Sequence, residues 1–494
     1  MKPLLLLPVL TCTALTLPGQ ESPFIGPRSV GMGGAGMASV RDGSAIYRNP
    51  AAFGFMGAGS DEDDAESAGN DNSGLGDRDF GIGLIDAQFG LRITGDFAQR
   101  VDQLASYDID ALGTQTTYTE SDINQILELA GLIGDLDDPA NTIQLDANIG
   151  SSFRFGNFAV GLRQFITYGA LVAEVDLQNI GLNAADLDTA LDDARGATTP
   201  TGDTLTTEQK NQLTNSGISA VNVDYIDHLL STTSGVANSD IQTAINTLLE
   251  IADQTGVGGG ALEDNQTAVL FTGFSALEIP VSYGWAFLDD MSVGITGKYI
   301  QGRVYGTTLL VFDSDTNLVE ETLENAPDHY EESSNIGIDL AFMWRLPKVN
   351  LAISGTNLNE PEFDGFTTES GYRVPDVTLE RQVRIGAAFM PMETLAIEVD
   401  LDLLEQRSVV GTYDTQFVHL GVEWDVIRVL ALRAGGYQNL AADDGDTAIS
   451  LGVGINLWAA RIDLGGAMSL EEETVDGTEF PTEARLGLGV SIEF

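Results

Sequence analysis

The last twelve residues, 483–494 (EARLGLGVSIEF), decide the fold of this 494-residue chain. Every second position carries an apolar side chain, and the positions between them carry Glu, Arg, Ser or Gly. A repeat of two is typical of a β-strand with two different faces. The apolar face comprises Ala484, Leu486, Leu488, Val490, Ile492 and Phe494. One face of this strand therefore suits an apolar environment, and the other does not.

The same alternation recurs from residue 80 onward, for example in residues 449–457 and 417–424. The chain contains 56 glycines, and many of them fall on the second face. A soluble β-sandwich would bury a bulky face and expose a polar one, so glycine on the second face favours a crowded barrel interior. The alternation predicts fourteen strands, at about 80–93, 143–155, 157–175, 266–288, 291–312, 334–345, 349–358, 378–390, 394–404, 414–424, 427–437, 446–457, 460–470 and 483–494.

The connections between these strands alternate strictly between tight and long. The tight ones lie near Gly156, Asp289 and Asp290, Pro347, Pro391, Asp425 and Ala459. Bacterial outer-membrane barrels have an even number of strands, short periplasmic turns and longer outer loops. We therefore predict an all-β fold over residues 80–494: a 14-stranded antiparallel transmembrane β-barrel in the bacterial outer membrane, with both termini in the periplasm.

The first 20 residues are typical of a secretory signal peptide, with Lys2 before an apolar core and small residues after it. Lipid modification of Cys12 is the alternative interpretation of this segment. After removal beyond Cys12, the mature chain has no cysteine and forms no disulfide. No later stretch reaches 18 apolar residues, which excludes a helical membrane span.

The formal net charge of -51 opposes nucleic-acid binding, because phosphate and protein repel one another. We interpret the charge as a solvated acidic exterior. Bridging by divalent cations, either between loops or to lipopolysaccharide, is the second interpretation.

Two connections, residues 95–142 and 176–265, are much longer than ordinary loops and change to helical spacing. The first carries Ile123, Ile126, Leu127, Ala130 and Ile133, with Ser121 as the predicted N-cap. The second carries Ile241, Ala244, Ile245, Leu248, Leu249 and Ala252 after Ser239. We expect helical extracellular inserts whose apolar faces pack on each other or on the barrel rim. Capture of a hydrophobic ligand or of a partner protein is the alternative.

Residues 21–58 precede the first strand and are rich in Gly, Ala and Ser. A segment with so little bulk can approach other backbone closely in a confined space. It is predicted to be an N-terminal hatch or plug in the lumen. Residues 59–79 form an acidic hinge, because their charge and their Gly, Ser and Asn content cannot support a core.

Two stretches, 26–36 (GPRSVGMGGAG) and 42–52 (DGSAIYRNPAA), resemble the N-terminal hatch of the FadL-type outer-membrane transporter superfamily. Residues 297–299, 399–403 and 432–437 and the two helical inserts are most similar to the branch named conjugal transfer protein TraF. The resemblance implies a fourteen-stranded barrel. It also implies a hatch whose Asn49-Pro50-Ala51 turn lies in the lumen, and passive diffusion of hydrophobic molecules. Phe494 resembles the C-terminal signal read by the barrel assembly machinery.

Strand parity predicts a set of charged side chains that face the lumen. Its members are Lys298, Arg384, Glu398, Asp400, Asp402, His419, Glu423, Arg433, Arg461, Asp463, Arg485 and Glu493. Charges of both signs in one lumen are expected to pair across strands. We interpret the set as a structural polar network, with a path for polar solutes as the alternative. A charged lumen also disfavours a simple axial conduit for fatty acids.

No catalytic, cofactor or metal site is predicted. The chain has three histidines. His228 and His329 lie in predicted outer loops without an accompanying serine motif. His419 shares a strand face with Glu423, and such a pairing is more often structural than catalytic. Residues 313–324 imitate a calcium loop, but Leu318 replaces the required glycine. We therefore expect the protein not to be an enzyme.

Passive uptake of small hydrophobic molecules is the leading functional hypothesis. The alternative is an envelope partner of a conjugation or secretion system that does not transport. A passive surface protein or phage receptor is a third class. The expected partners are outer-membrane lipid and lipopolysaccharide, the barrel assembly machinery, and either a small hydrophobic ligand or envelope secretion or conjugation proteins, with no nucleic acid.

Overall fold

The structure is a computed structural model. It describes residues 24–56, 80–95, 97–105, 117–136, 141–174, 176, 184–197, 202–232, 246, 266–310, 329–368, 371–408, 413–427, 429–442, 447–457, 459–475 and 478–493. The predicted signal peptide, the acidic hinge 59–79, the calcium-like loop 313–324 and Phe494 lie outside the described residues. So does the helix predicted at 241–252, except for Asn246.

Fourteen antiparallel strands form one closed barrel, which confirms the predicted fold and strand count. Each predicted strand overlaps one strand of the barrel. The ring closes between the first and last strands, where Gly90 pairs with Arg485. The barrel strands are β1 (Phe80–Thr94), β2 (Thr142–Phe155), β3 (Phe158–Glu174), β4 (Ala268–Leu288), β5 (Met291–Leu310), β6 (Tyr330–Arg345), β7 (Val349–Thr356), β10 (Gln382–Met392), β11 (Leu395–Asp402), β14 (Phe417–Ile427), β15 (Leu430–Asn439), β16 (Thr447–Leu457), β17 (Ala460–Ser469) and β20 (Glu483–Glu493).

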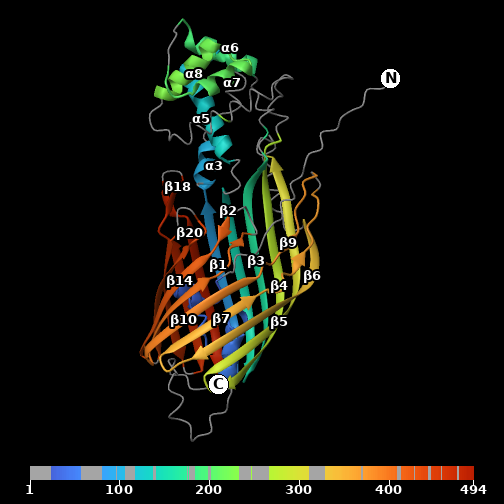
Figure 1. Ribbon diagram of the computed structural model, residues 1–494, viewed down its shortest axis with the longest axis vertical. Helices are drawn as coiled ribbons and strands as arrows, with labels where there is room; N and C mark the ends of the chain where they lie inside the picture. Colours follow the sequence, from blue (N-terminus) through green and yellow to red (C-terminus); the bar gives the residue numbers. More distant parts are fainter. Residues whose placement is uncertain are drawn as a thin grey trace, which may run out of the picture.

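Short and long connections alternate around the ring, as predicted. Residues 156–157, 289–290, 346–348, 393–394, 428–429 and 458–459 make the short connections. They lie together at one end of the barrel, which we call the turn end, and the helices extend from the opposite, insert end (Figure 1). Strand order and connection length therefore give the same orientation for every strand.

The barrel is apolar outside and polar inside. On β20, Leu486 is 67 % exposed and Leu488 is 44 % exposed, whereas Arg485 is only 5 % exposed. Trp285 and Phe155 add exposed aromatic rings near the turn end. Apolar exteriors with buried charges are the pattern of barrels that stand in lipid.

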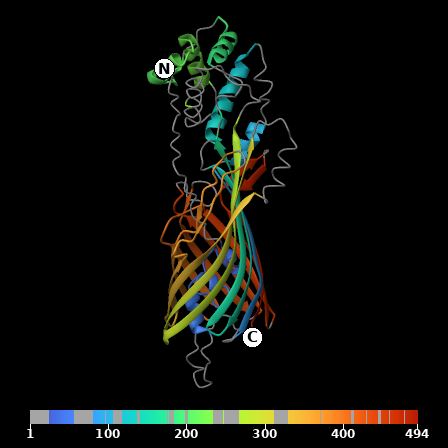
Figure 2. The same ribbon diagram turned by 90° about the vertical axis from the view of Figure 1, so that its right-hand side faces the viewer.

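The inserts contain α3 (Phe97–Ala105) and α5 (Glu120–Leu136) in the first, and α6 (Ala184–Arg195), α7 (Thr207–Asn215) and α8 (Ala220–Thr232) in the second. Apolar side chains of α5, α6, α7 and α8 pack into one core, which includes Ile123, Leu191 and Ile226. We call this unit the helical cap (Figure 2). No helix in the described part of the chain has the length and apolar character needed to cross a membrane.

The predicted N-cap at Ser121 is wrong, because α5 already begins at Glu120. Thr119 precedes the helix and exchanges hydrogen bonds with Asp122. The Thr119 backbone N–H donates to Asp122 Oδ2 over 2.7 Å, and the Asp122 N–H donates to Thr119 Oγ1 over 3.4 Å. The cap therefore lies two residues earlier in the chain, where both residues can satisfy a free N–H.

Three short hairpins in the long connections were not predicted. They pair β8 (Glu362–Phe363) with β9 (Val377–Thr378), β12 (Gln406–Arg407) with β13 (Asp414–Thr415), and β18 (Glu472–Val475) with β19 (Thr478–Pro481). Strands of two to four residues are too short to show a period, so alternation cannot reveal them.

Residues 24–56, which we call the lumenal segment, lie inside the ring in its turn-end half (Figure 2). The segment comprises α1 (Pro27–Gly31), α2 (Ala45–Arg48) and the 3-10 helix η1 (Pro50–Phe55). Its apolar side chains, among them Ile46 and Phe53, pack against small inward side chains such as Ala159 and Ala352. Small side chains of the wall therefore leave space, and the few large side chains of the segment fill it.

Candidate functional site

The lumen is the candidate site, and the predicted turn Asn49-Pro50-Ala51 lies within it. The fully buried Asn49 side chain donates to Met37 O over 3.0 Å and accepts from the Ala51 N–H over 3.1 Å, so it caps η1. Ser292 Oγ on β5 donates to Ala51 O over 2.7 Å. The turn is thus fixed both to its own segment and to the wall.

Two carboxylates on β11 hold the middle of the lumenal segment. Asp400 Oδ2 accepts from the backbone N–H groups of Gly36 and Met37 over 3.0 and 3.1 Å. Glu398 accepts from the Ala38 N–H and from Ser39 Oγ, each over 2.5 Å. Four consecutive residues of the segment therefore depend on two acidic side chains of one strand. Charge-assisted hydrogen bonds of this kind are roughly twice as strong as neutral ones.

Glu423 on β14 is the centre of an arginine cluster. Its carboxylate accepts from Arg28 Nε of the lumenal segment over 2.9 Å and from Arg433 Nε of β15 over 2.6 Å. Arg461 lies 3.7 Å away and also pairs with Asp463 over 2.8 Å. One carboxylate thus links the segment to side chains of β14, β15 and β17.

His419 contacts the segment from β14. Its Nδ1 lies 2.8 Å from Gly33 O, and its ring lies edge-on to Phe24 at a centroid distance of 5.8 Å. The pairing of His419 with Glu423 suggested by their shared face does not occur as a direct contact among the described interactions. Each side chain binds a different part of the lumenal segment instead.

The other predicted lumenal residues form separate pairs. Arg384 Nε lies 2.6 Å from Asp402 Oδ1 on the neighbouring strand. Lys298 Nζ lies 3.0 Å from Asp339 Oδ1 on β6. Arg485 belongs to a third group, described next. Apart from Glu493, whose side chain the structure does not describe, the predicted set is therefore buried in the lumen but divided into several local groups.

A glycine allows Arg485 to reach past its neighbouring strand. Arg485 on β20 binds both oxygens of Asp146 on β2, over 2.9 and 3.0 Å. Gly90 on β1 pairs with both residues in the sheet, and a Cβ at Gly90 would lie 2.6 Å from Asp146 Oδ2. Any larger residue at position 90 would separate the two charges. Inward glycines here make space for ionic contacts and for the lumenal segment.

Several partners of the predicted residues were missed. Asp146, Glu483 and Asp339 all lie on inward faces, and Glu483 joins Arg485, Arg92 and Tyr437. Their strand parity was a usable signal, because Glu483 shares a face with Arg485. Arg28 gave no such signal, since parity does not apply to a segment without strands.

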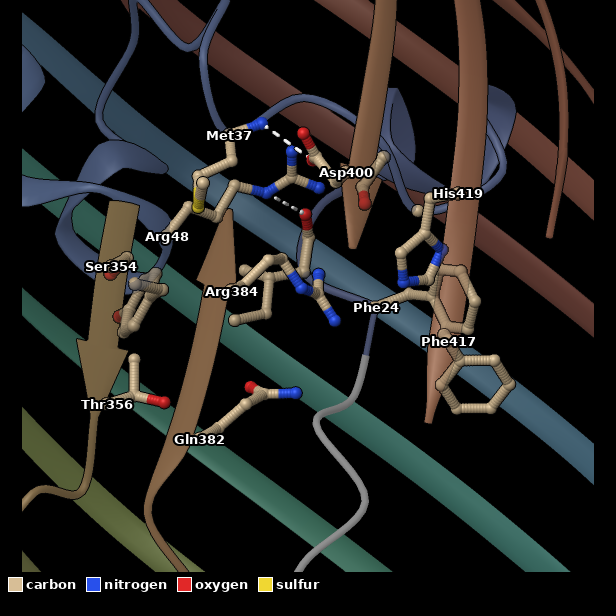
Figure 3. Close-up of a pocket in the computed structure, with 14 residues that line it drawn as sticks. Phe24, Met37, Arg48, Ser354, Thr356, Gln382, Arg384, Asp400, Phe417 and His419 are labelled. Atoms are coloured by element: carbon tan, nitrogen blue, oxygen red, sulfur yellow. Dashed lines mark hydrogen bonds between the residues drawn. The ribbon is translucent and has the colours of Figure 1, made fainter. Parts of the chain in front are cut away.

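The cavities beside the lumenal segment are small. One has a volume of about 50 Å³ and is lined by residues that include Arg48, Arg384, Asp400 and His419 (Figure 3). Another, of about 60 Å³, lies beside Asp42 and Asp86. A dry cavity that binds benzene has about 150 Å³. The lumen as it stands therefore has room for water at these two places but not for an aromatic ring.

The insert-end part of the lumen is apolar on one side. Phe165, Phe274, Ile300 and Val304 project from β3, β4 and β5 into one buried cluster, which side chains of the β8–β9 hairpin complete. The opposite side of the same part carries the ion pairs Arg92 with Glu483 and Arg384 with Asp402. The lumen thus has a plugged turn-end half and an insert-end half whose β3–β5 side is apolar.

The described residues show no arrangement for metal or nucleophilic chemistry. They contain no group of three or more His, Cys, Asp or Glu that could hold a metal ion. Of the histidines, His228 lies on α8 and His329 lies just before β6, far from His419 in the lumen.

Fold and lumen together define the class: a fourteen-stranded barrel of the outer-membrane type whose interior is filled by its own N-terminal segment. The family model described as "F plasmid transfer operon, TraF, protein" matches residues 46–402, and the chain belongs to this family. The TraF-type recognition made from the sequence is confirmed. Among curated proteins, none matches the chain.

Several solved structures resemble the chain at low sequence identity. The Ralstonia pickettii toluene transporter TbuX is 13 % identical, with 95 % of this chain and 98 % of that chain covered and a TM-score of 0.45. The Pseudomonas aeruginosa FadL homologue is 11 % identical, with 96 % and 99 % covered and a TM-score of 0.45. The P. putida toluene transporter TodX is 11 % identical, with 95 % and 98 % covered and a TM-score of 0.44.

Proposed function

We propose that the protein lies in a bacterial outer membrane and mediates passive uptake of small hydrophobic molecules. The observation that supports this most is the division of the lumen. Its insert-end half has an apolar side formed by β3, β4 and β5, and its turn-end half is closed by a segment held to the wall through hydrogen bonds. A hydrophobic solute enters along the apolar side, and displacement of the hatch, residues 21–58, opens the rest.

The orientation follows from the positions of the turns. Short connections of outer-membrane barrels face the periplasm, so the turn end faces the periplasm and the helical cap faces the cell exterior. Both termini are then periplasmic. Lipid and lipopolysaccharide surround the apolar exterior, and the barrel assembly machinery reads the C-terminal strand. The protein acts without catalysis and without a cofactor.

The transport proposal is tested by loosening the hatch. Purified protein is placed in liposomes, and uptake of the hydrophobic dye 1-N-phenylnaphthylamine is timed. Replacing Glu398 and Asp400 by Gln and Asn removes the charges that bind residues 36–39. The double variant should take up the dye faster than the wild type.

Asp402→Asn is the matched control. Asp402 lies on the same strand and binds Arg384, but it makes no described hydrogen bond to the lumenal segment. Its uptake should equal that of the wild type. Equal uptake by liposomes with and without the wild-type protein would refute the proposal.

The family match supports a second candidate, an envelope partner of a conjugation or secretion system without transport activity. Under this function the helical cap, rather than the lumen, is the surface that binds the partner proteins. The test compares conjugation frequency between cells with the intact chain and cells whose chain lacks residues 184–232. Reduced conjugation together with unchanged dye uptake would favour this candidate over the first.

A further inference from the structure

The β8–β9 hairpin covers the apolar side of the lumen. Residues 361–368 and 371–379, which we call the lid hairpin, place Phe363, Val374, Val377 and Leu379 in full burial against the wall. Within the hairpin, Leu379 N–H donates to Pro361 O over 2.9 Å. The lid hairpin is thus a small, self-bonded unit that contacts the barrel mainly through apolar side chains.

The wall under the lid hairpin leaves space for the aromatic ring of a side chain. Phe363 lies 5.0 Å from Phe274 between ring centroids, and Phe274 lies 5.9 Å from Phe165. At Gly302 a Cβ would lie 2.3 Å from Phe363 Cδ1, so the missing side chain makes the space that the ring fills. The Phe363 ring therefore shows which chemistry this chamber accepts: a flat, apolar group beside two aromatic side chains.

The lid hairpin also fills a notch in the barrel wall. Strand β6 begins at Tyr330, but its pairing with β7 begins only at Leu340. Beyond that point the lid hairpin borders β6: Asn335 Nδ2 donates to Glu362 O over 3.1 Å, and the Asp364 N–H donates to Ser333 Oγ over 3.2 Å. Leu358 and Asn359, just before the lid hairpin, form hydrogen bonds with Ile336 and Ile338 of β6. The lid hairpin itself therefore makes only two described hydrogen bonds to β6 in place of a continuous ladder.

The base of the lid hairpin is a fixed pivot. Asn357 and Glu360 have φ of 50° and 48°, in the left-handed region that non-glycine residues seldom adopt. Lys298 Nζ donates to Asn357 Oδ1 over 2.6 Å, and the Asn357 N–H donates to Asp339 Oδ1 over 2.8 Å. The lumenal residue Lys298 thus anchors residue 357, while the part beyond residue 360 is held by burial and by the two hydrogen bonds to β6.

We propose that the chamber under the lid hairpin is an entry site for a small aromatic hydrophobic ligand, and that the Phe363 ring occupies the ligand position when the lid is closed. The inference rests on the proposed uptake function and names the site at which uptake begins. The lid hairpin lifts from β5 and β6 about residues 357–360, and the ligand takes the place of Phe363 against Phe274.

A reversible disulfide tests the lid. A Cβ at Gly306 would lie 3.2 Å from Val374 Cβ, close to the roughly 3.5–4.5 Å that a disulfide requires. Gly306→Cys with Val374→Cys therefore locks the lid hairpin to β5 under oxidation and frees it under reduction. Cys12 is the one natural cysteine, and it lies in the predicted signal peptide.

The readout is photolabelling in liposomes with 3-trifluoromethyl-3-(m-iodophenyl)diazirine, an apolar aromatic probe, mapped by mass spectrometry. Labelling of Phe274, Ile300 and Val304 should fall at least about tenfold on oxidation, because a locked lid removes the binding-competent state. Ile279 and Ile295 face outward and should label equally in both states. The single-cysteine variants should not respond to oxidation.

Phe363→Ala is an independent variant that needs no disulfide. It should raise labelling of the same inward residues, because the ligand position is then empty. Equal inward labelling in the oxidised and reduced protein, or no inward labelling even in Phe363→Ala, would overturn the inference. If lid-dependent labelling occurs without dye uptake, the entry site stands and the transport proposal fails.

Discussion

Arg28 and Glu423 are 395 positions apart in the chain, yet Arg28 Nε lies 2.9 Å from Glu423 Oε2 inside the barrel. Both side chains are largely buried, and the contact joins the lumenal segment to β14. The same carboxylate holds Arg433, whose side chain is fully buried. Removal of this one carboxylate therefore disturbs both the wall and the segment.

Glu423→Gln should destabilise the barrel by about 3–5 kcal/mol, because breaking a buried ion pair leaves uncompensated charge. Arg28→Met should cost less, since Glu423 keeps Arg433. Urea unfolding of the purified protein in lipid vesicles measures both. Glu332→Gln is the control: Glu332 pairs with Arg303 on the exposed exterior, where such pairs contribute about 0–1 kcal/mol. Equal losses of unfolding free energy for Glu423→Gln and Glu332→Gln would contradict a stabilising role of the arginine cluster around Glu423.

Gly465→Ala should unseat α1 of the lumenal segment. A Cβ at Gly465 would lie 2.4 Å from Pro27 O, whereas the nearest atom to a Cβ at Gly466 is 3.6 Å away. Overpacking costs typically about 1–3 kcal/mol, so Gly465→Ala lowers stability and exposes residues 27–31 to protease. Gly466→Ala should behave as wild type. Limited proteolysis followed by mass spectrometry distinguishes the two, and identical cleavage patterns would refute the close approach.

Asp227→Asn should loosen the helical cap without affecting the barrel. Asp227 Oδ1 accepts from the N–H groups of Thr204 and Leu205, each over 2.7 Å, and its Oδ2 lies 2.6 Å from Lys210 Nζ. Hydrogen bonds to a charged group contribute about 1.5–3 kcal/mol. Hydrogen exchange in α7 and α8 should accelerate, while exchange in the strands stays constant. Asp224→Asn is the control, because the half-exposed Asp224 also binds Lys210 but no backbone group among the described contacts.

Hydrogen bonds to Asp227 and then to Asp224 raise the pKa of Lys210 above its usual value. A raised pKa means that the contribution of the pair is complete below the unfolded lysine value of about 10.4 and is lost as the pH rises through the folded value. The helical cap should therefore keep this contact at neutral pH and weaken only in strong alkali. A loss of the contact between pH 6 and 8 would disagree with this sign.

Deletion of Phe494 should impair barrel assembly rather than uptake. The residue ends the apolar face of the last strand and lies outside the described residues. Outer-membrane yield of the deletion variant, compared with that of Phe494→Tyr, measures the effect. Yield of the deletion equal to that of the wild type would remove the assembly role.

The sequence contained most of the barrel, because lipid on one side and a packed lumen on the other impose a period of two on every long strand. The ends of the strands were predicted less accurately than their number. Strand β6, for example, begins at Tyr330, four residues before its predicted start. That part of β6 is bordered by the lid hairpin rather than by β7, and its faces alternate less clearly in hydrophobicity. The lid hairpin itself has strands of two residues, which no periodicity can detect.

Strand parity could tell which side chains face the lumen, but not which of them meet. Arg485 reaches Asp146 across an intervening strand because position 90 is glycine. Lys298 binds Asp339 and the base of the lid hairpin rather than another member of the predicted set. Such contacts depend on the height of each residue along the barrel axis. This height follows from the register and the tilt of the strands, which the sequence of one strand alone does not determine.

The seam between β1 and β20 sets the order in which the barrel can be completed. Every other pair of neighbouring barrel strands is consecutive along the chain, so these pairs can form in order, but Gly90 can pair with Arg485 only after the last strand is present. Joining ends so distant in sequence carries the largest loop-closure cost of any pairing. Two ionic contacts cross this seam, Arg92 with Glu483 and Arg485 with Asp146. These two ion pairs can therefore form only when the barrel closes, and they stabilise the closed barrel at that last step.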